Sequence, residues 1–235
     1  MNVSIHRLSV LLATSLVTPP AIAGELTGSV GAQLFSSYYF RGADIFDGRP
    51  NVQPSASLGW TDPAITLGVW AAVPLARRSQ LKNVRDEIDV TLNWDLPILD
   101  LATISAGGIL YLNPAAEPFF NTEEVYLLAR APLGAGFAAR AGVYADLDAL
   151  RGVYATFGPG YVLETLAPLK VEAWLMAGLS KYRGHPTSLL ELGATVSVTY
   201  EAGHGVLPTV SSIASWNAFA QEMRYAMSAG GSVTW

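Results

Sequence analysis

Apolar and polar residues alternate along most of this chain with a repeat of two. In the segment 87–95 every second residue is apolar, and the residues between are charged, amide or hydroxyl side chains. The segment 171–180 also has an apolar residue at every second position. This repeat is typical of a β-strand with one apolar and one polar face. Because it recurs to the end of the chain, it predicts an up-and-down antiparallel transmembrane β-barrel of about 12 strands, apolar outside and polar inside.

The predicted strands are about 8 to 15 residues long, which suits the roughly 9 to 11 residues that a tilted strand needs to cross a bilayer. They cover residues 26–40, 51–60, 65–73, 87–95, 102–113, 124–131, 137–146, 153–164, 171–180, 189–200, 208–217 and 224–235. Pro54, Pro159 and Pro208 fall inside these segments. Since proline has no N–H for the ladder, we expect these residues at bulges or strand ends.

The connections between the predicted strands alternate in length. The longer ones are 41–50, 74–86, 114–123 and 181–188, and the shorter ones are 61–64, 96–101, 132–136 and 165–170. Outer-membrane barrels have short periplasmic turns and longer outer loops. The pattern therefore predicts that the ends with long connections face outward and that both termini lie in the periplasm.

Aromatic residues of the apolar parity fall near the strand ends, and no charged residue lies on that parity within the predicted strands. Amphipathic rings favour the headgroup level of a bilayer, so two aromatic girdles are expected. The periplasmic girdle would hold Trp60, Trp94, Phe137, Tyr200 and Trp235, and the outer girdle Tyr38, Phe40, Trp216 and Tyr225.

Composition and the amino terminus agree with an exported membrane protein. The chain is 51% hydrophobic and 14% charged, and its mean hydropathy is +0.31. A weakly positive start, an apolar stretch at 8–17 and the small residues at 21–23 predict a signal peptide at 1–23, leaving 24–235 as the outer-membrane barrel. Uncharged runs such as 101–116 are shorter than the roughly 20 residues of a spanning helix. The chain has no cysteine, which excludes thiolate chemistry, and its net charge of −5 disfavours nucleic-acid binding.

The last predicted strand ends on Trp235 with Val233 two places before it. This ending resembles the carboxy-terminal signal by which the bacterial barrel-assembly machinery recognises outer-membrane barrels, so the resemblance implies that machinery as a partner. Near the front, Leu34-Phe35-Ser36-Ser37-Tyr38-Tyr39-Phe40-Arg41-Gly42 is similar to the Ser-Asp-Tyr-x-Phe-Arg-Gly stretch of the TorF-like family of outer-membrane porins, with Ser37 in place of the aspartate. That likeness implies a small barrel and a pore without an established substrate.

The polar parity places charged, amide and aromatic side chains inside the barrel. The predicted lumen-lining residues are Asp89, Asn93, Glu124, Tyr126, Arg130, Arg140, Tyr144, Glu172, Trp174 and Glu191. They predict a narrow passage for small solutes or ions, mainly acidic and so favouring cations, with Arg130 and Arg140 as constriction groups. In the alternative, these arginines pair with Glu124, Glu172 or Glu191 and the barrel is plugged, with a structural or adhesive role.

Enzymatic and metal chemistry find less support in the sequence. Some small barrels modify lipids with a Ser-His pair, but His185 and His204 fall in connections and not beside a serine and an acid on one strand face. Asp44, Asp47 and Asn51 carry hard oxygen ligands without the spacing of a calcium loop. We therefore expect no enzymatic activity, no bound metal and no cofactor.

Outer-membrane lipid and lipopolysaccharide are the remaining expected partners. Positive side chains of the second long connection could contact lipopolysaccharide phosphates. These side chains are Arg77, Arg78, Lys82 and Arg85.

Overall fold

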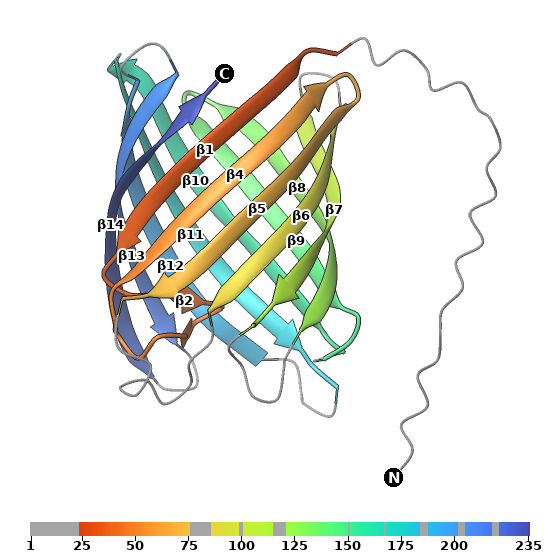
Figure 1. The fold of residues 1–235 in the computed structure, drawn as a ribbon, viewed down its shortest axis with the longest axis vertical. Coiled ribbons are helices and arrows are strands. Elements are labelled where there is room, and N and C mark those ends of the chain that lie inside the picture. Colours follow the sequence, from red (N-terminus) through yellow and green to blue (C-terminus); the bar gives the residue numbers. More distant parts are fainter. Residues whose placement is uncertain are drawn as a thin grey trace, which may run out of the picture.

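The computed structural model describes residues 24–75, 86–98, 101–114, 121–149, 151–166, 168–183, 188–201, 205–217 and 221–235. Its main feature is a single antiparallel sheet that closes into a barrel of twelve strands in sequence order (Figure 1). The strands are β1 (Leu26–Phe35), β4 (Asn51–Thr61), β5 (Ala64–Pro74), β6 (Glu87–Ile98), β7 (Ala102–Leu112), β8 (Thr122–Gly134), β9 (Phe137–Asp146), β10 (Val153–Leu166), β11 (Leu169–Lys181), β12 (Ser188–Tyr200), β13 (Val206–Asn217) and β14 (Glu222–Thr234). The predicted all-β barrel is confirmed.

The first and last strands pair with each other and so close the sheet. β1 and β14 run antiparallel, with Val30 opposite Val233. The backbones of Gly28 and Trp235 exchange two hydrogen bonds of 3.0 and 3.1 Å at the end of this seam. The indole of Trp235 lies over Gly28, where an added Cβ would come within 2.4 Å of the ring. Gly28 is therefore the residue that lets the carboxy-terminal tryptophan lie flat across the seam.

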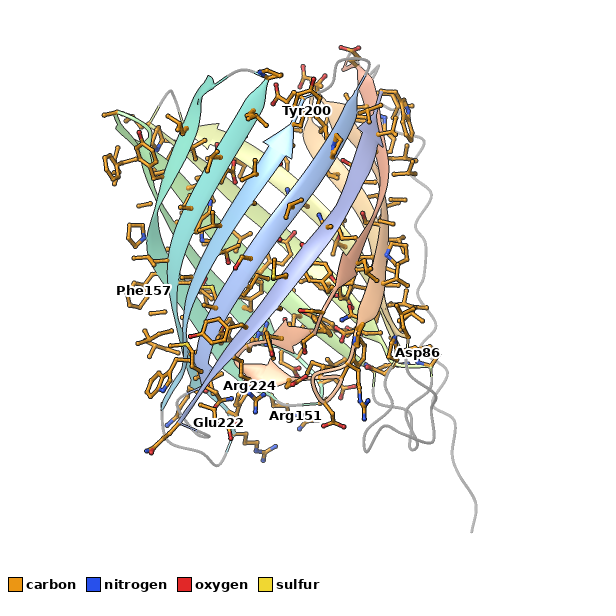
Figure 2. The ribbon with its side chains drawn as sticks, turned by 90° about the vertical axis from the view of Figure 1, so that its left-hand side faces the viewer. Asp86, Arg151, Phe157, Tyr200, Glu222 and Arg224 are labelled. Atoms are coloured by element: carbon orange, nitrogen blue, oxygen red, sulfur yellow. The ribbon has the colours of Figure 1, made fainter. Side chains whose placement is uncertain are left out.

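The two ends of the barrel differ as the connection lengths predict. The β4–β5 and β8–β9 connections have two residues each, and the chain's carboxy terminus lies at the same end (Figure 1); we call this the turn end. The opposite, loop end carries the longer connections. Figure 2 shows Tyr200 at the turn end and Asp86, Arg151 and Arg224 at the loop end.

The outer face of the barrel is apolar along its length. Large side chains such as Leu92 (55% exposed), Leu127 (55%) and Leu175 (57%) point away from the lumen, as does Phe157 in Figure 2. Water would penalise so much exposed hydrocarbon, whereas lipid does not. No helix in the described part of the chain is long and apolar enough to cross a membrane.

Most of the predicted girdle residues lie on this outer face. Toward the turn end stand Trp60, Trp94, Phe137, Tyr200 and Trp235, and toward the loop end Trp216 and Tyr225. Phe137 also packs edge-on against Tyr161, with 4.9 Å between ring centroids. Tyr38 and Phe40 do not belong to this set, because the chain leaves the barrel wall before it reaches them.

The first strand ends at Phe35, five residues earlier than predicted. Beyond it, the short strands β2 (Tyr39–Phe40) and β3 (Ala43–Asp44) form a separate two-stranded hairpin at the loop end. The alternation of apolar and polar residues continues through Phe40 because this segment also has two faces. Both of its faces lie within the mouth of the barrel.

The three prolines that the sequence places within strands, Pro54, Pro159 and Pro208, interrupt the ladder on one side only. Pro54 is opposite Ala32 of β1, while the ladder toward β5 omits it and resumes at Ser55. Pro159 is opposite Ala139 of β9 and is omitted from the ladder toward β11. The missing N–H is thus tolerated inside the strand, and only Pro208 lies near a strand end as predicted.

Leu92 tests the lipid-facing assignment. Replacing Leu92 at mid-strand with arginine should lower the free energy of unfolding by about 2 to 4 kcal/mol, because the charge would face hydrocarbon. The measurement is urea unfolding in phosphatidylcholine vesicles. Leu101→Arg, at the turn end, is the control, with an expected loss below about 1 kcal/mol. Equal losses for the two variants would contradict a bilayer around the barrel.

Candidate functional site

The hairpin β2–β3 enters the mouth of the barrel through a two-residue turn. Tyr39 is opposite Asp44 and Phe40 is opposite Ala43, which leaves Arg41 and Gly42 at the turn with φ of 49° and 77°. Positive φ at both turn residues is the geometry of a type I′ hairpin. Glycine suits the second position sterically as well, since a Cβ there would lie 3.0 Å from the carbonyl oxygen of Leu190.

Arg41 forms a buried ion pair with Glu124 of β8. The two terminal nitrogens of its guanidinium each donate to one carboxylate oxygen at 2.7 Å, and the two side chains are only 9% and 2% exposed. Burial lowers the pKa of Arg41, but the hydrogen bonds and charge of Glu124 outweigh it and leave the pKa above its ordinary value. Arg41 is therefore a permanent cation, and the bidentate contact offsets the cost of its left-handed backbone, about 1 to 3 kcal/mol.

Aromatic rings surround the same guanidinium. Its central carbon lies 4.7 Å from the ring centroid of Phe40, 5.2 Å from that of Tyr144 and 4.3 Å from that of Tyr154. Tyr144 is paired in register with Tyr154 of β10. Cation–π contacts in a desolvated place stabilise a cation by up to about 2 kcal/mol. The inner wall is thus built to receive Arg41.

Tyr38 and Phe46 extend this anchoring along the neighbouring wall. Phe46 is fully buried, with its ring centroid 5.4 Å from that of Tyr38, and Tyr38 packs against Trp70 at 5.5 Å. The Tyr38 hydroxyl donates to Glu87 at 3.3 Å. Burial, together with the nearby carboxylates of Glu87 and Asp89, raises the pKa of Tyr38 well above its usual value, so it stays a neutral donor.

The prediction that Tyr38 and Phe40 belong to the outer girdle is therefore wrong. Tyr38 contacts residues of the inner wall, and the Phe40 ring lies edge-on to Tyr111 of β7, with 6.0 Å between centroids. The physical reason is that the chain turns inward after β1, so these two rings face the lumen and not the lipid.

The hairpin also contacts the wall opposite Glu124. The side-chain amide of Asn217, at the end of β13, donates to the carbonyl oxygen of Gly42. The Tyr39 hydroxyl donates to the carbonyl oxygen of Tyr225 on β14 at 3.3 Å. The hairpin is thus fixed at both sides of the barrel and crosses its mouth.

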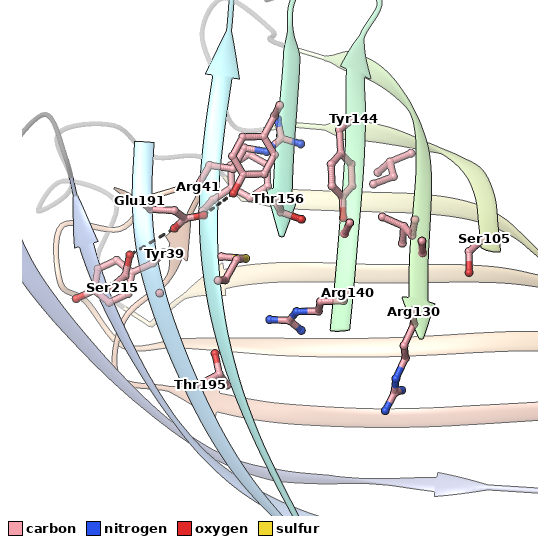
Figure 3. A pocket seen from close by; sticks show the side chains of 18 of the residues that line it. Tyr39, Arg41, Ser105, Arg130, Arg140, Tyr144, Thr156, Glu191, Thr195 and Ser215 are labelled. Atoms are coloured by element: carbon pink, nitrogen blue, oxygen red, sulfur yellow. Dashed lines mark hydrogen bonds between the residues drawn. The ribbon is translucent and has the colours of Figure 1, made fainter. Parts of the chain in front are cut away.

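A cavity of about 800 Å³ lies in the lumen beside the hairpin. Phe40 and Arg41 line it from the hairpin, and hydroxyl side chains such as Ser105, Thr156 and Thr195 line it from the strands (Figure 3). Arg130 and Arg140 project into the same space from neighbouring strands (Figure 3). The barrel interior is therefore partly filled at the loop end and hollow deeper inside.

The ten residues predicted to line the lumen all lie on the inner face. Their positions follow from their contacts with one another and with the hairpin: Asn93 accepts from Tyr126 at 2.8 Å, for example. The set comprises Asp89, Asn93, Glu124, Tyr126, Arg130, Arg140, Tyr144, Glu172, Trp174 and Glu191.

The lumen carboxylates have partners other than the predicted arginines. Glu124 pairs with Arg41. Glu191 accepts from the Tyr154 hydroxyl at 2.5 Å, and Glu172 pairs with Lys170 at 3.1 Å. Among the described residues neither Arg130 nor Arg140 forms an ion pair with any of these three acids, so the pairing predicted in the alternative is wrong. The residue that does so for Glu124 comes from a connection and not from a strand.

Sequence reasoning missed Arg41 as a lumen residue, together with Tyr111 and Tyr154. Tyr111 donates to Glu124 at 2.8 Å and both tyrosines stand on the inner parity of their strands, so parity could have identified them. For Arg41 the available signal was the dipeptide Arg41–Gly42, since a glycine after a polar residue favours a tight hairpin. A second signal was the excess of carboxylates near the loop end, because carboxylates withdrawn from water need a positively charged partner.

Several predicted features lie outside the described residues. These are the signal peptide at 1–23, the basic residues Arg77, Arg78, Lys82 and Arg85, and the histidines His185 and His204. Within the described part of the chain, no group of three or more acidic or histidine side chains could hold a metal ion. Asp44 instead accepts hydrogen bonds from Ser37 and from the backbone of Phe46, at 3.3 and 3.2 Å.

Comparison with solved structures supports the barrel assignment. A KdgM porin solved in complex with disordered oligogalacturonate matches with a TM-score of 0.57 and 12% sequence identity, over 88% of this chain and 98% of that one. The NanC porin matches with a TM-score of 0.58 and 9% identity, over the same shares of the two chains. No protein-family model and no curated protein matches the sequence. The likeness concerns the fold, which together with the apolar outer face is that of an outer-membrane β-barrel.

Removing the acid of the buried ion pair should release the hairpin. Because the chain has no cysteine, Ser37→Cys supplies a single thiol at a position that is 4% exposed. Adding Glu124→Gln leaves Arg41 buried without its counter-charge, which costs about 3 to 5 kcal/mol. Maleimide labelling of the thiol should accelerate by about tenfold or more.

The matched control is Glu172→Gln, which removes an inner-wall carboxylate that the hairpin does not contact. This variant should label at the rate of the parent. Unchanged labelling in the Glu124→Gln protein, or equal acceleration in both, would show that the ion pair does not hold the hairpin.

Proposed function

We propose that this chain is an outer-membrane channel for small solutes or ions in which the hairpin β2–β3 forms the constriction. The observation that carries the proposal is the cavity of about 800 Å³ inside the barrel, since a barrel with a purely structural role has no need of an internal cavity. Twelve strands enclose more room than eight-stranded barrels, whose side chains fill the interior, and less than open porins of roughly 16 to 18 strands. The likeness to porins agrees with this function.

The charge of the lumen changes along its axis. Carboxylates are concentrated on the inner face toward the loop end, near the hairpin; they are Glu87, Asp89, Glu124, Asp146 and Glu191. We therefore propose that the acidic lumen expected from the sequence corresponds to this outer part. Because Glu124 is neutralised by Arg41 and Glu191 is hydrogen-bonded, we propose a weak preference for cations at the entrance.

Partners follow from the position in the membrane. We propose that the outer leaflet around the loop end is lipopolysaccharide and that the carboxy-terminal strand β14 contacts the assembly machinery during insertion. Support for the second proposal is the exposed Trp235, which is 60% accessible on the outer face. Membership of the TorF-like family stays a prediction that the motif at 36–42 supports.

The catalytic alternative lacks support in the described residues. The cavity is lined by hydroxyl groups, by arginines and by the carboxylates of Asp95 and Glu191, and the sequence places His185 and His204 in connections and not beside a serine and an acid on one strand face. We therefore propose a non-enzymatic role.

Conductance tests the channel and its constriction together. Purified protein in planar bilayers should give small stepwise currents. Replacing Phe40, Arg41 and Phe46 with serine removes the cation and two of the rings that hold the hairpin, so the step size should increase severalfold. The control is Arg49→Ser, an exposed residue of the same connection, which should leave the step unchanged.

Stepless membranes for both the wild type and the triple serine variant would exclude the channel and favour the plugged structural barrel. Liposome swelling with a panel of sugars, amino acids and salts then identifies the size and charge of solutes that pass.

A further inference from the structure

Two arginines face each other on the inner wall of the hollow part of the barrel. Arg130 of β8 is directly opposite Arg140 of β9 in the sheet register. Both side chains point into the lumen and line the cavity (Figure 3). Like charges directly opposite one another across two strands destabilise a sheet. A neutral pair of side chains at these positions would make the barrel wall more stable. Stability of the wall therefore does not account for the two arginines.

Neither arginine has an acidic partner in the part of the chain that the structure describes. Among the residues that the structure describes, no carboxylate oxygen lies within 4.0 Å of either guanidinium, whereas Arg41 and Arg224 both have such partners. Glu172, whose charge acts on both arginines, is itself paired with Lys170 at 3.1 Å and accepts from the Trp174 indole at 3.5 Å. The positive charge of the pair is therefore incompletely balanced by the protein.

Trp174 positions both guanidinium groups. Their central carbons lie 5.3 Å (Arg130) and 4.5 Å (Arg140) from the centroid of its ring. The ring rests on the backbone of β10, since a Cβ added at Gly160 would lie 2.2 Å from the ring atom Cε3. One face of the indole is thus covered by the strand, and the arginines gather on the side that faces the lumen. Contact with a buried ring orients the guanidinium planes without consuming their N–H donors.

We propose that Arg130, Arg140 and Trp174 form a binding site for small solutes that carry two or more carboxylate or phosphate groups. Each guanidinium presents a planar fork of donors that matches a carboxylate or phosphate. Two such forks side by side fit two anionic groups of one molecule, or one multiply charged group. The cavity has room for such a solute, and its threonine and serine hydroxyls can bind neutral polar groups of the same molecule.

This site deepens the proposed channel function by naming a class of solute. The pair lies toward the turn end on β8 and β9, away from the carboxylates at the loop end. A solute that passes the hairpin would meet the arginines next. Binding would be transient, because one wall of the lumen supplies the cations and the remaining walls are neutral or acidic.

Binding and conduction are measured separately, so that the site and the channel can fail independently. Isothermal titration calorimetry of detergent-solubilised protein uses citrate and pyrophosphate as probes, with glucose as a neutral probe. Arg130→Gln with Arg140→Gln should weaken binding of both anions by about tenfold or more. The control, Arg151→Gln with Arg224→Gln, removes the same charge from the loop end (Figure 2) and should bind as the wild type does.

In planar bilayers, citrate should reduce the potassium chloride current of the wild type and of the control, but much less that of the Arg130→Gln, Arg140→Gln protein. The double glutamine variant should also shift the reversal potential toward cation selectivity. If it fails to fold, as judged by heat-modifiable migration, Arg130→Lys with Arg140→Lys keeps the charge, loses the forks and should bind the anions with intermediate affinity.

The results separate the two proposals. Citrate binding without any current would retain the site and exclude the channel. Current without citrate binding, or equal weakening in the two double glutamine variants, would overturn the site and leave the channel. Binding of glucose as tight as that of citrate would also overturn it, because charge would then play no part.

Discussion

The closure of the sheet is the constraint on which the rest of this structure depends. Hydrocarbon offers no partner to a backbone N–H or C=O, so each strand that crosses a bilayer needs a neighbour on both sides. The pairing of β1 with β14 supplies the last of these neighbours, and Gly28 and Trp235 end the seam with reciprocal hydrogen bonds. Once the sheet is closed, every residue has either lipid or lumen beside it. Alternation then assigns the apolar set outward and leaves the charged set no place except inside.

The hairpin β2–β3 resolves a problem that closure creates. Acidic side chains near the loop end are confined to a narrow lumen, where charges withdrawn from water need partners. Arg41 provides one for Glu124, and its guanidinium also stacks among Phe40, Tyr144 and Tyr154. The same contacts carry the segment across the mouth, so charge balance and narrowing of the lumen arise from one residue.

Deeper in the barrel, toward the turn end, the neighbouring charges are positive and not negative. Arg130 and Arg140 share the ring of Trp174 and have no acid in contact among the described residues. A protein can hold two neighbouring cations at the expense of some stability when a ligand completes the arrangement. The described charges thus divide the lumen into an outer part, where Arg41 neutralises Glu124, and an inner part, where Arg130 and Arg140 have no acid in contact among the described residues.

The sequence by itself determined the barrel, the number of strands and the face on which each strand residue lies. A repeat of two is a local property of the sequence. In a closed sheet that crosses a bilayer it allows one arrangement only, with the apolar face against lipid and the polar face toward the lumen. The ten predicted lumen residues are on the inner face for that reason. Strand ends were also close to the observed ones, except where β1 stops at Phe35.

Only the tertiary structure decided the course of residues 36–49 and the pairing of charges inside. Tyr38, Phe40 and Arg41 continue the alternation without sitting in the wall, and parity cannot distinguish a strand in lipid from a hairpin in a lumen. Nor can parity tell which of several cations meets Glu124, because such contacts join residues far apart in the chain and depend on distances that exist only once the barrel has closed.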